Sequence, residues 1–177
     1  MPLLMLKNLP QYECLIKAAE HYPELDPSAT EAFLNLLRTG DLLFEATNRF
    51  LTRNNISQGR FIVMMLLLHR SGGETSTPAS LAEESGVTRA TMTGLLDTLE
   101  KDGMVVREAD THDRRTLHVR LTDQGRACMS SIIPSYYQGV SRIMNPLSQP
   151  ERKELVRLLQ KLQEELTPLS APTAPAQ

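Results

Sequence analysis

The segment from Ser85 to Gly125 constrains the fold of this chain most strongly, because its hydrophobic pattern changes period partway along. Its first half carries apolar residues at helical spacing, on one face of a predicted helix: Met92, Leu95, Leu96 and Leu99. Thr88 is a suitable N-cap for this helix, and Gly103 suits its C-terminal end. Apolar and polar residues then alternate over 117–121, as in a half-buried strand. The segment therefore predicts a capped helix followed by a β-hairpin.

The other face of this helix carries small and hydroxyl-bearing side chains. Its members are Arg89, Ala90, Thr91, Thr93, Gly94, Asp97 and Thr98. A helix that only had to stay in solution would more often carry long lysine and glutamate side chains there. Small polar residues near a helix N-terminus, with one arginine, suit a helix that closely approaches base edges and phosphates. We therefore predict DNA contacts from this set, with Gly94 permitting close approach: Thr88, Arg89, Ala90, Thr91 and Thr93.

A polar loop with adjacent arginines separates two predicted strands, 104–107 and 117–121. Arg114 and Arg115 in this loop are suited to contacting phosphates or entering a minor groove. Asp113 is placed to accept a charge-assisted hydrogen bond from Arg115 and to fix its direction. An ordinary solvated hairpin is the alternative. The order helix, strand, basic loop, strand is more specific than any of its parts, and it predicts the wing of a DNA-binding domain.

This region resembles the MarR/SlyA family of winged-helix transcription regulators on the residues VTRATMTGLLDTLEKDGMVVREADTHDRRTLHVRLTDQG. The resemblance is dense over 57–125, and it is looser, by helix pattern only, over 28–166. Members of the family often carry arginine where this chain has Gly94 and Thr98. The resemblance implies a homodimer that binds double-stranded DNA at a pseudo-palindromic operator. It also implies a repressor whose DNA binding is relieved by a small aromatic or lipophilic ligand.

The whole chain is predicted to be mainly α-helical, with a small β-hairpin wing in a winged helix-turn-helix core. Five segments are expected: an N-terminal extension with a short helix (1–27), an N-terminal dimerisation helix (28–56), the winged helix-turn-helix DNA-binding domain (57–122), C-terminal dimerisation helices (123–167) and a flexible tail (168–177). The apolar helices at both ends are predicted to pack against a second copy of the chain. Completion of a monomeric core is the alternative.

Two helix starts carry recognisable capping signals. Ser28 and Glu31 stand at the spacing of a capping box, at the beginning of the first long helix. Thr77 followed by Pro78 predicts an N-cap and a proline at the first helical position of a short helix that ends at Ser85. Because a helix N-terminus favours anions, Ser76 and Thr77 are predicted to donate to a DNA phosphate.

The charge of the chain gives no general support for nucleic-acid binding. The formal net charge is -2 and the isoelectric point is about 6.1. Between residues 88 and 120 the cations are balanced by acids: Arg89, Lys101, Arg107, Arg114, Arg115 and Arg120 against Asp97, Glu100, Asp102, Glu108, Asp110 and Asp113. DNA binding therefore requires that the cations gather on one surface while the acids cap helices or orient arginines. A winged helix that binds protein instead of DNA remains an alternative.

The ligand crevice that the family resemblance implies would lie between the first long helix and the one that follows it. Its walls would be Leu36, Leu43, Phe44, Met64, Met65 and Leu68. Methionine-rich walls can reshape around varied apolar ligands. The alternative is that these residues are ordinary core.

Other chemistry finds little support in the sequence. No nucleotide-binding, hydrolase or metalloprotease motif is present, so we expect no enzyme activity and no cofactor. The scattered histidines predict no metal site: His21, His69, His112 and His118. Cys14 and Cys128 form no CxxC motif and suit a reducing cytosol, although a thiol-based sensor of the same fold is an alternative. With no signal peptide and no long apolar run, we expect a cytoplasmic protein that does not enter a membrane.

Overall fold

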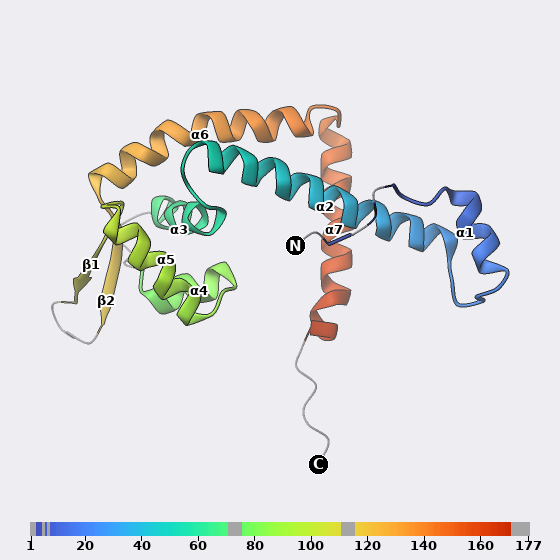
Figure 1. The fold of residues 1–177 in the computed structure, drawn as a ribbon, viewed down its shortest axis with the longest axis horizontal. Coiled ribbons are helices and arrows are strands. Elements are labelled where there is room, and N and C mark those ends of the chain that lie inside the picture. Colours follow the sequence, from blue (N-terminus) through green and yellow to red (C-terminus); the bar gives the residue numbers. More distant parts are fainter. Residues whose placement is uncertain (1–2, 5, 7, 71–75, 111–115, 171–177) are drawn as a thin grey trace, which may run out of the picture. The chain divides into compact units, whose positions relative to one another are not determined.

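The computed structural model describes residues 3–4, 6, 8–70, 76–110 and 116–170 (Figure 1). It confirms a mainly helical chain with a small hairpin. The elements in chain order are α1 (Tyr12–Ala19), α2 (Pro27–Arg53), α3 (Gln58–His69), α4 (Pro78–Ser85), α5 (Arg89–Lys101), β1 (Val105–Ala109), β2 (Leu117–Leu121), α6 (Asp123–Met144) and α7 (Gln149–Ser170). The chain forms two units, residues 1–129 and 130–177, and α6 belongs to both.

The core of the first unit lies where α3, α4, α5 and the hairpin meet. Its most deeply buried side chains are Leu51, Met64, Leu81, Met92, Leu96, Leu99 and Leu121. The apolar stripe predicted for the helix after Thr88 therefore packs inward, apart from Leu95, which is half-buried. Burial of this stripe, rather than helix propensity alone, holds α5 in place.

The first long helix begins at Pro27, earlier than its sequence signal indicated. Asp26 is the N-cap, and its carboxylate accepts from the backbone N–H groups of Ser28 and Ala29 at 2.8 and 3.1 Å. The hydrogen bond from the Ser28 hydroxyl lowers the pKa of Asp26 most, and the bonds from the Ala29 and Ser28 backbone N–H groups lower it further. The predicted capping box of Ser28 and Glu31 is wrong, because Ser28 already lies inside the helix that Asp26 caps.

The chain reverses sharply at the end of α5 to enter the hairpin. Gly103, with φ of 70°, donates its N–H to Glu100 O at 2.9 Å, and Met104 donates to Leu99 O at 2.8 Å. This pair of bonds is the Schellman arrangement, which favours glycine because its backbone must be left-handed. The helix end predicted from Gly103 is confirmed.

The hairpin presents an apolar inner face. Val105 pairs with Leu121 and Arg107 with Val119 in an antiparallel register, so each pair shares one face. Val105, Val119 and Leu121 are buried. The first strand runs later than the predicted 104–107, whereas the second matches its predicted bounds. A backbone bond from Val119 N–H to Ser76 O, 2.7 Å long, ties the second strand to the segment before α4.

The second unit consists of the later part of α6, followed by α7. Ser148 precedes α7, and both its backbone N–H and its hydroxyl donate to the Glu151 carboxylate, at 2.7 and 2.6 Å. Helix α7 continues to Ser170, so the predicted tail 168–177 begins too early; residues 171–177 lie outside the described part. Many apolar side chains of this unit are exposed: Tyr137, Val140, Ile143, Leu155, Val156, Leu158, Leu162 and Leu166.

Candidate nucleic-acid interface

Helix α5 presents the predicted small polar face to solvent. Every residue of that face is exposed: Arg89, Ala90, Thr91, Thr93, Gly94, Asp97 and Thr98. Thr88 is the N-cap, because its Oγ1 accepts from the Thr91 N–H at 3.1 Å. The sequence prediction of the cap is therefore confirmed. Whether these residues contact DNA remains a prediction.

The hydroxyls of α5 are bonded within the helix. Thr93 donates to Arg89 O and Thr98 donates to Gly94 O, each at 2.9 Å. A hydroxyl that donates to its own backbone still offers its lone pairs and its neighbouring methyl group. In this state Thr93 and Thr98 therefore present an acceptor and a methyl, which suits contact with a base donor or a thymine methyl.

Arg89 is the uncommitted cation of this face. Within the described residues, its guanidinium makes no ion pair and no hydrogen bond. A shallow hollow of about 420 Å³ brings Arg89 and Thr93 together with Thr77 at the start of α4 and with Leu117 of β2. Two helix N-termini and a free arginine at one hollow suit a phosphate or another anion.

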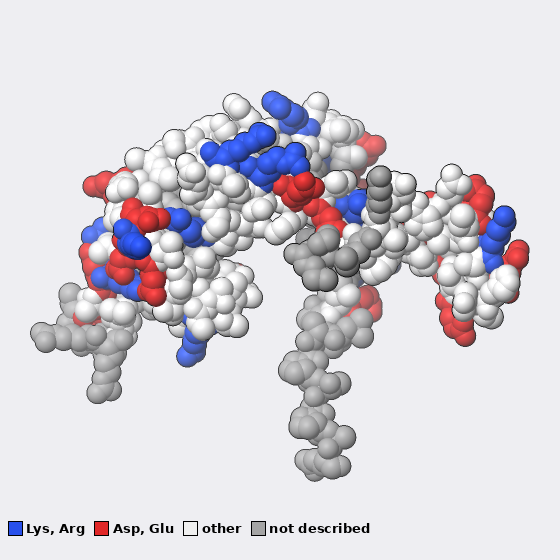
Figure 2. Space-filling view, in the orientation of Figure 1, with Lys and Arg blue, Asp and Glu red and all other residues white. Residues whose placement is uncertain are grey.

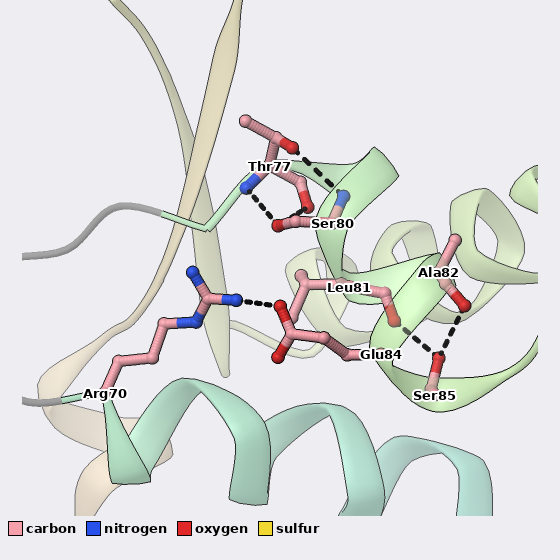
Figure 3. A network of polar contacts seen from close by, with 7 residues as sticks. All are labelled: Arg70, Thr77, Ser80, Leu81, Ala82, Glu84 and Ser85. Atoms are coloured by element: carbon pink, nitrogen blue, oxygen red, sulfur yellow. Dashed lines mark hydrogen bonds and ion pairs between the residues drawn. The ribbon is translucent and has the colours of Figure 1, made fainter.

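Helix α4 is fixed at both ends by polar contacts (Figure 3). Thr77 Oγ1 accepts from the Ser80 N–H, and Ser80 Oγ accepts from the Thr77 N–H, each at 3.1 Å, which completes a capping box. Near the other end, Glu84 pairs with Arg70, which follows α3. Thr77 thus has the predicted N-cap role, and Ser80 is its reciprocal partner that the sequence analysis missed.

Ser76 does not fit its predicted role. Its side chain is buried, with 1% exposed, and its hydroxyl oxygen has no hydrogen-bond partner among the described residues. Its own carbonyl oxygen accepts from the Val119 N–H, which ties the residue to β2 and keeps its side chain away from a phosphate on the surface. We therefore remove Ser76 from the predicted DNA contacts and keep Thr77.

Acids around the hairpin are neutralised by local pairing. Four basic residues pair with the five described acids between residues 97 and 110: Arg107 with Asp97 and Glu100, Arg60 with Asp102, Arg120 with Glu108, and His118 with Asp110. The hydrogen bond from Arg120 lowers the pKa of Glu108 and raises that of Arg120. The prediction that acids orient cations is thus confirmed for these residues.

On the face drawn in Figure 2, the described cations near the hairpin do not gather into one patch, because the strand arginines Arg107 and Arg120 are used in these pairs. Blue and red atoms are mixed over the hairpin and the adjoining part of α5, and the surface over α4 is mostly uncharged (Figure 2). Asp113, Arg114 and Arg115 lie outside the described residues, so their predicted contacts remain predictions. On either side of that gap, Asp110 N–H donates to Thr116 O at 2.9 Å.

The model of the MarR family matches residues 56–117 of this chain. The transcriptional repressor YetL of Bacillus subtilis is 34% identical over 162 residues, which cover 92% of this chain and 96% of YetL. The chain belongs to the MarR family. It is therefore a transcription regulator and not an enzyme.

Solved structures of MarR-family proteins share this fold. AbsC, a MarR family regulator from Streptomyces coelicolor, has a TM-score of 0.74 at 22% identity and covers 80% of this chain and 96% of its own. MepR of S. aureus, solved as a complex with DNA, has a TM-score of 0.67 at 17% identity, covering 76% of this chain and 95% of its own.

The predicted ligand walls of this MarR-family chain differ in burial, and whether they enclose a ligand remains a prediction. Met64 is fully buried in the core, whereas Leu36 and Phe44 are 41% and 54% exposed. Leu43, Met65 and Leu68 are half-buried. Phe44 instead lines a hollow of about 330 Å³ with Leu4, Arg38, Asp41, Leu42, Glu45 and Asn48, none of them a predicted wall. The core assignment is therefore correct for Met64.

The described residues also bear on the predictions for thiols, metal sites and membrane helices. Neither cysteine forms a disulfide within the described residues: Cys14 is exposed and Cys128 half-buried. No group of three histidine, cysteine, aspartate or glutamate side chains is placed to hold a metal within the described ranges. None of the described helices combines the length and apolarity needed to cross a bilayer.

Proposed function

We propose that this chain is a dimeric repressor that binds a pseudo-palindromic operator through α5 and the wing, and that a small aromatic or lipophilic ligand relieves the binding. One observation carries the DNA-binding part: α5 is anchored by a buried stripe while its opposite face is neutral, hydroxyl-rich and begins with Arg89, which has no ion pair among the described residues. An apolar or acidic face would instead suit a protein partner. MepR, which shares this fold, was solved bound to DNA.

Dimerisation is supported by the exposed apolar surface of the second unit. Helix α7 has 22 residues, and of its described side chains only Leu159 is even half-buried in the single chain. Most of the stability of a protein helix comes from packing of its apolar face, so the exposed leucines of α7 need a packing partner. A second copy supplies one, and two-fold pairing would set two α5 helices about 34–36 Å apart, on successive major grooves.

Ligand control is supported by apolar side chains that the single chain leaves open on α2. Leu36 and Phe44 of this helix are exposed, and Met65 and Leu68 of α3 are half-buried. A ligand that prefers one spacing of the two α5 helices would shift the equilibrium toward it by no more than that preference. An aromatic or lipophilic molecule matches these walls better than a polar one.

The test is selection of duplexes from a randomised pool by the full chain, followed by titration of the selected duplex. We expect an enriched sequence with two-fold symmetry, binding by a dimer in multi-angle light scattering, and weaker binding by Arg89→Ala. Enrichment of no sequence would refute sequence-specific binding. Binding that no member of a panel of aromatic acids and neutral lipophilic aromatic compounds weakens would refute the ligand-relief part for those classes.

A further inference from the structure

We propose that Arg107 is a positioning residue, which fixes the wing against α5 so that both meet DNA in one geometry. The inference rests on the proposed DNA binding and deepens it. Its evidence is the place of Arg107 in the hairpin register, its contacts to α5, and the contrast with Arg120 in the same hairpin.

Arg107 lies on the inner face of the hairpin, where a charge is unexpected. It pairs in register with Val119, so the two side chains share the face that buries Val105 and Leu121. Its side chain is only 19% exposed. A guanidinium directed toward the body of a domain requires acceptors there, since burial of an unpaired charge is highly unfavourable.

Helix α5 supplies these acceptors. Arg107 Nη1 lies 2.6 Å from Asp97 Oδ1 and 3.3 Å from Glu100 Oε2, and Nη2 donates to Thr93 O at 3.3 Å. The backbone N–H of Arg107 also donates to Glu100 Oε1 at 3.1 Å. Arg107 of β1 is therefore bound to Thr93, Asp97 and Glu100, which follow one another at about one-turn intervals along one side of α5. The planar guanidinium can hold several acceptors at fixed angles, which an ammonium cannot.

These contacts reach the proposed DNA-binding face itself. Thr93, whose carbonyl Arg107 binds, lines the hollow that also contains Arg89. Asp97 lies one helical turn further along the same exposed face. The residue that orients the hairpin is thus bonded to the part of α5 expected to meet the bases, so a change in one is transmitted to the other.

Arg120 provides a matched comparison within the same hairpin. It lies on the outer face and forms two hydrogen bonds with Glu108 across the strands, at 2.9 and 2.5 Å. Both partners are half exposed, with 56% and 50% of their side chains accessible. This pair joins β2 to β1 but does not reach α5. Removal of either arginine deletes one cation from the hairpin, yet only Arg107 connects it to the recognition helix.

Arg107→Met is expected to fold. Methionine retains most of the apolar stem, and Asp97 and Glu100 are 58% and 39% exposed, so water can solvate both carboxylates once the arginine is gone. Matched unfolding midpoints for Arg107→Met and Arg120→Met would show that a difference between them does not arise from global stability.

The first measurement is amide hydrogen exchange of the DNA-free chain. Arg107→Met should speed exchange over 105–109, and Arg120→Met should leave these amides close to wild type. Equal exchange in both variants would overturn the anchoring of β1 by Arg107. Because no DNA is present, this measurement tests the anchoring of β1 to α5 even if the wild-type chain selects no duplex. A chain that selects no duplex would refute only the proposed function.

The second measurement compares the selected operator with a duplex trimmed of the flanking base pairs that the wing contacts. Wild type should lose affinity on trimming. In Arg107→Met the affinity ratio between the two duplexes should fall about tenfold, within the range of coupling between contacting residues. Arg107→Lys should recover part of that ratio, and Arg120→Met should keep it. An unchanged ratio in Arg107→Met, or an equal fall in Arg120→Met, would overturn the proposal.

Discussion

Gly94→Ala should stabilise the fold and weaken DNA binding at the same time. Gly94 lies in the interior of α5 and is exposed, and a methyl group added there would meet no atom within 4 Å. Alanine exceeds glycine in an exposed helix interior by about 0.8–1.0 kcal/mol, so the free energy of unfolding should rise by about that amount. On DNA, the same methyl would occupy the space through which α5 approaches the bases.

Urea unfolding and fluorescence titration of the selected duplex measure the two effects separately. Gly125→Ala is the contrasting variant, because its methyl would lie 2.1 Å from Met104 O, and it should destabilise the chain by about 1–3 kcal/mol or more. A destabilised Gly94→Ala would refute the account of α5 as an exposed, unstrained helix. A stabilised Gly94→Ala with full DNA affinity would refute the close approach of this face to DNA.

Three further predictions concern other parts of the chain. Ser76→Ala removes a buried hydroxyl that has no hydrogen-bond partner among the described residues, so the free energy of unfolding should rise by up to about 1 kcal/mol in urea unfolding. DNA affinity should be unchanged, and a loss of affinity would restore Ser76 as a contact. The N-terminal segment should detach from α2 in acid, because a hydrogen bond from the Leu3 N–H holds the pKa of Asp41 below its ordinary value of 3.8. Because the pKa of Asp41 is depressed in the folded chain, this stabilisation is present above pH 3.8 and is lost as the pH falls through the folded-state pKa. Amide protection of the N-terminal segment should therefore fall across that range in hydrogen exchange. Protection that does not change with pH would contradict this prediction. Alkylation of Cys14 should leave DNA binding unchanged when the labelled chain is titrated with the selected duplex. Release of DNA on labelling of Cys14 or Cys128 would favour the thiol-sensor alternative.

Local signals predicted much of the DNA-binding domain. The caps at Thr88 and Thr77, the end of α5 at Gly103 and the bounds of β2 follow from nearby residues, because each depends on a hydrogen bond or a pleat within a few positions. The start of α2 was misplaced, because Asp26 and Ser28 are both good caps and the sequence alone did not rank them.

The features that were missed depend on contacts between distant segments. Ser76 is buried because its carbonyl binds Val119, which is far along the chain and close only once the hairpin has folded. Arg107 was counted as one more cation of a strand, although its spacing of two from Val105 places both on one face. The alternation of strand residues could have placed Arg107 on the inner face of the hairpin. Its contacts with α5 could not be predicted, because they depend on how the hairpin packs against that helix.

In the proposed complex, two copies of the chain present α5 to successive major grooves of one duplex. The most direct measurement is cleavage of the selected operator by a hydroxyl-radical-generating iron chelate attached to Thr93→Cys, in a chain lacking Cys14 and Cys128. Two cleavage centres are expected, related by two-fold symmetry and about 10–10.5 base pairs apart, or a multiple of that spacing. A single centre, or no cleavage by a labelled chain that still binds the operator, would contradict it.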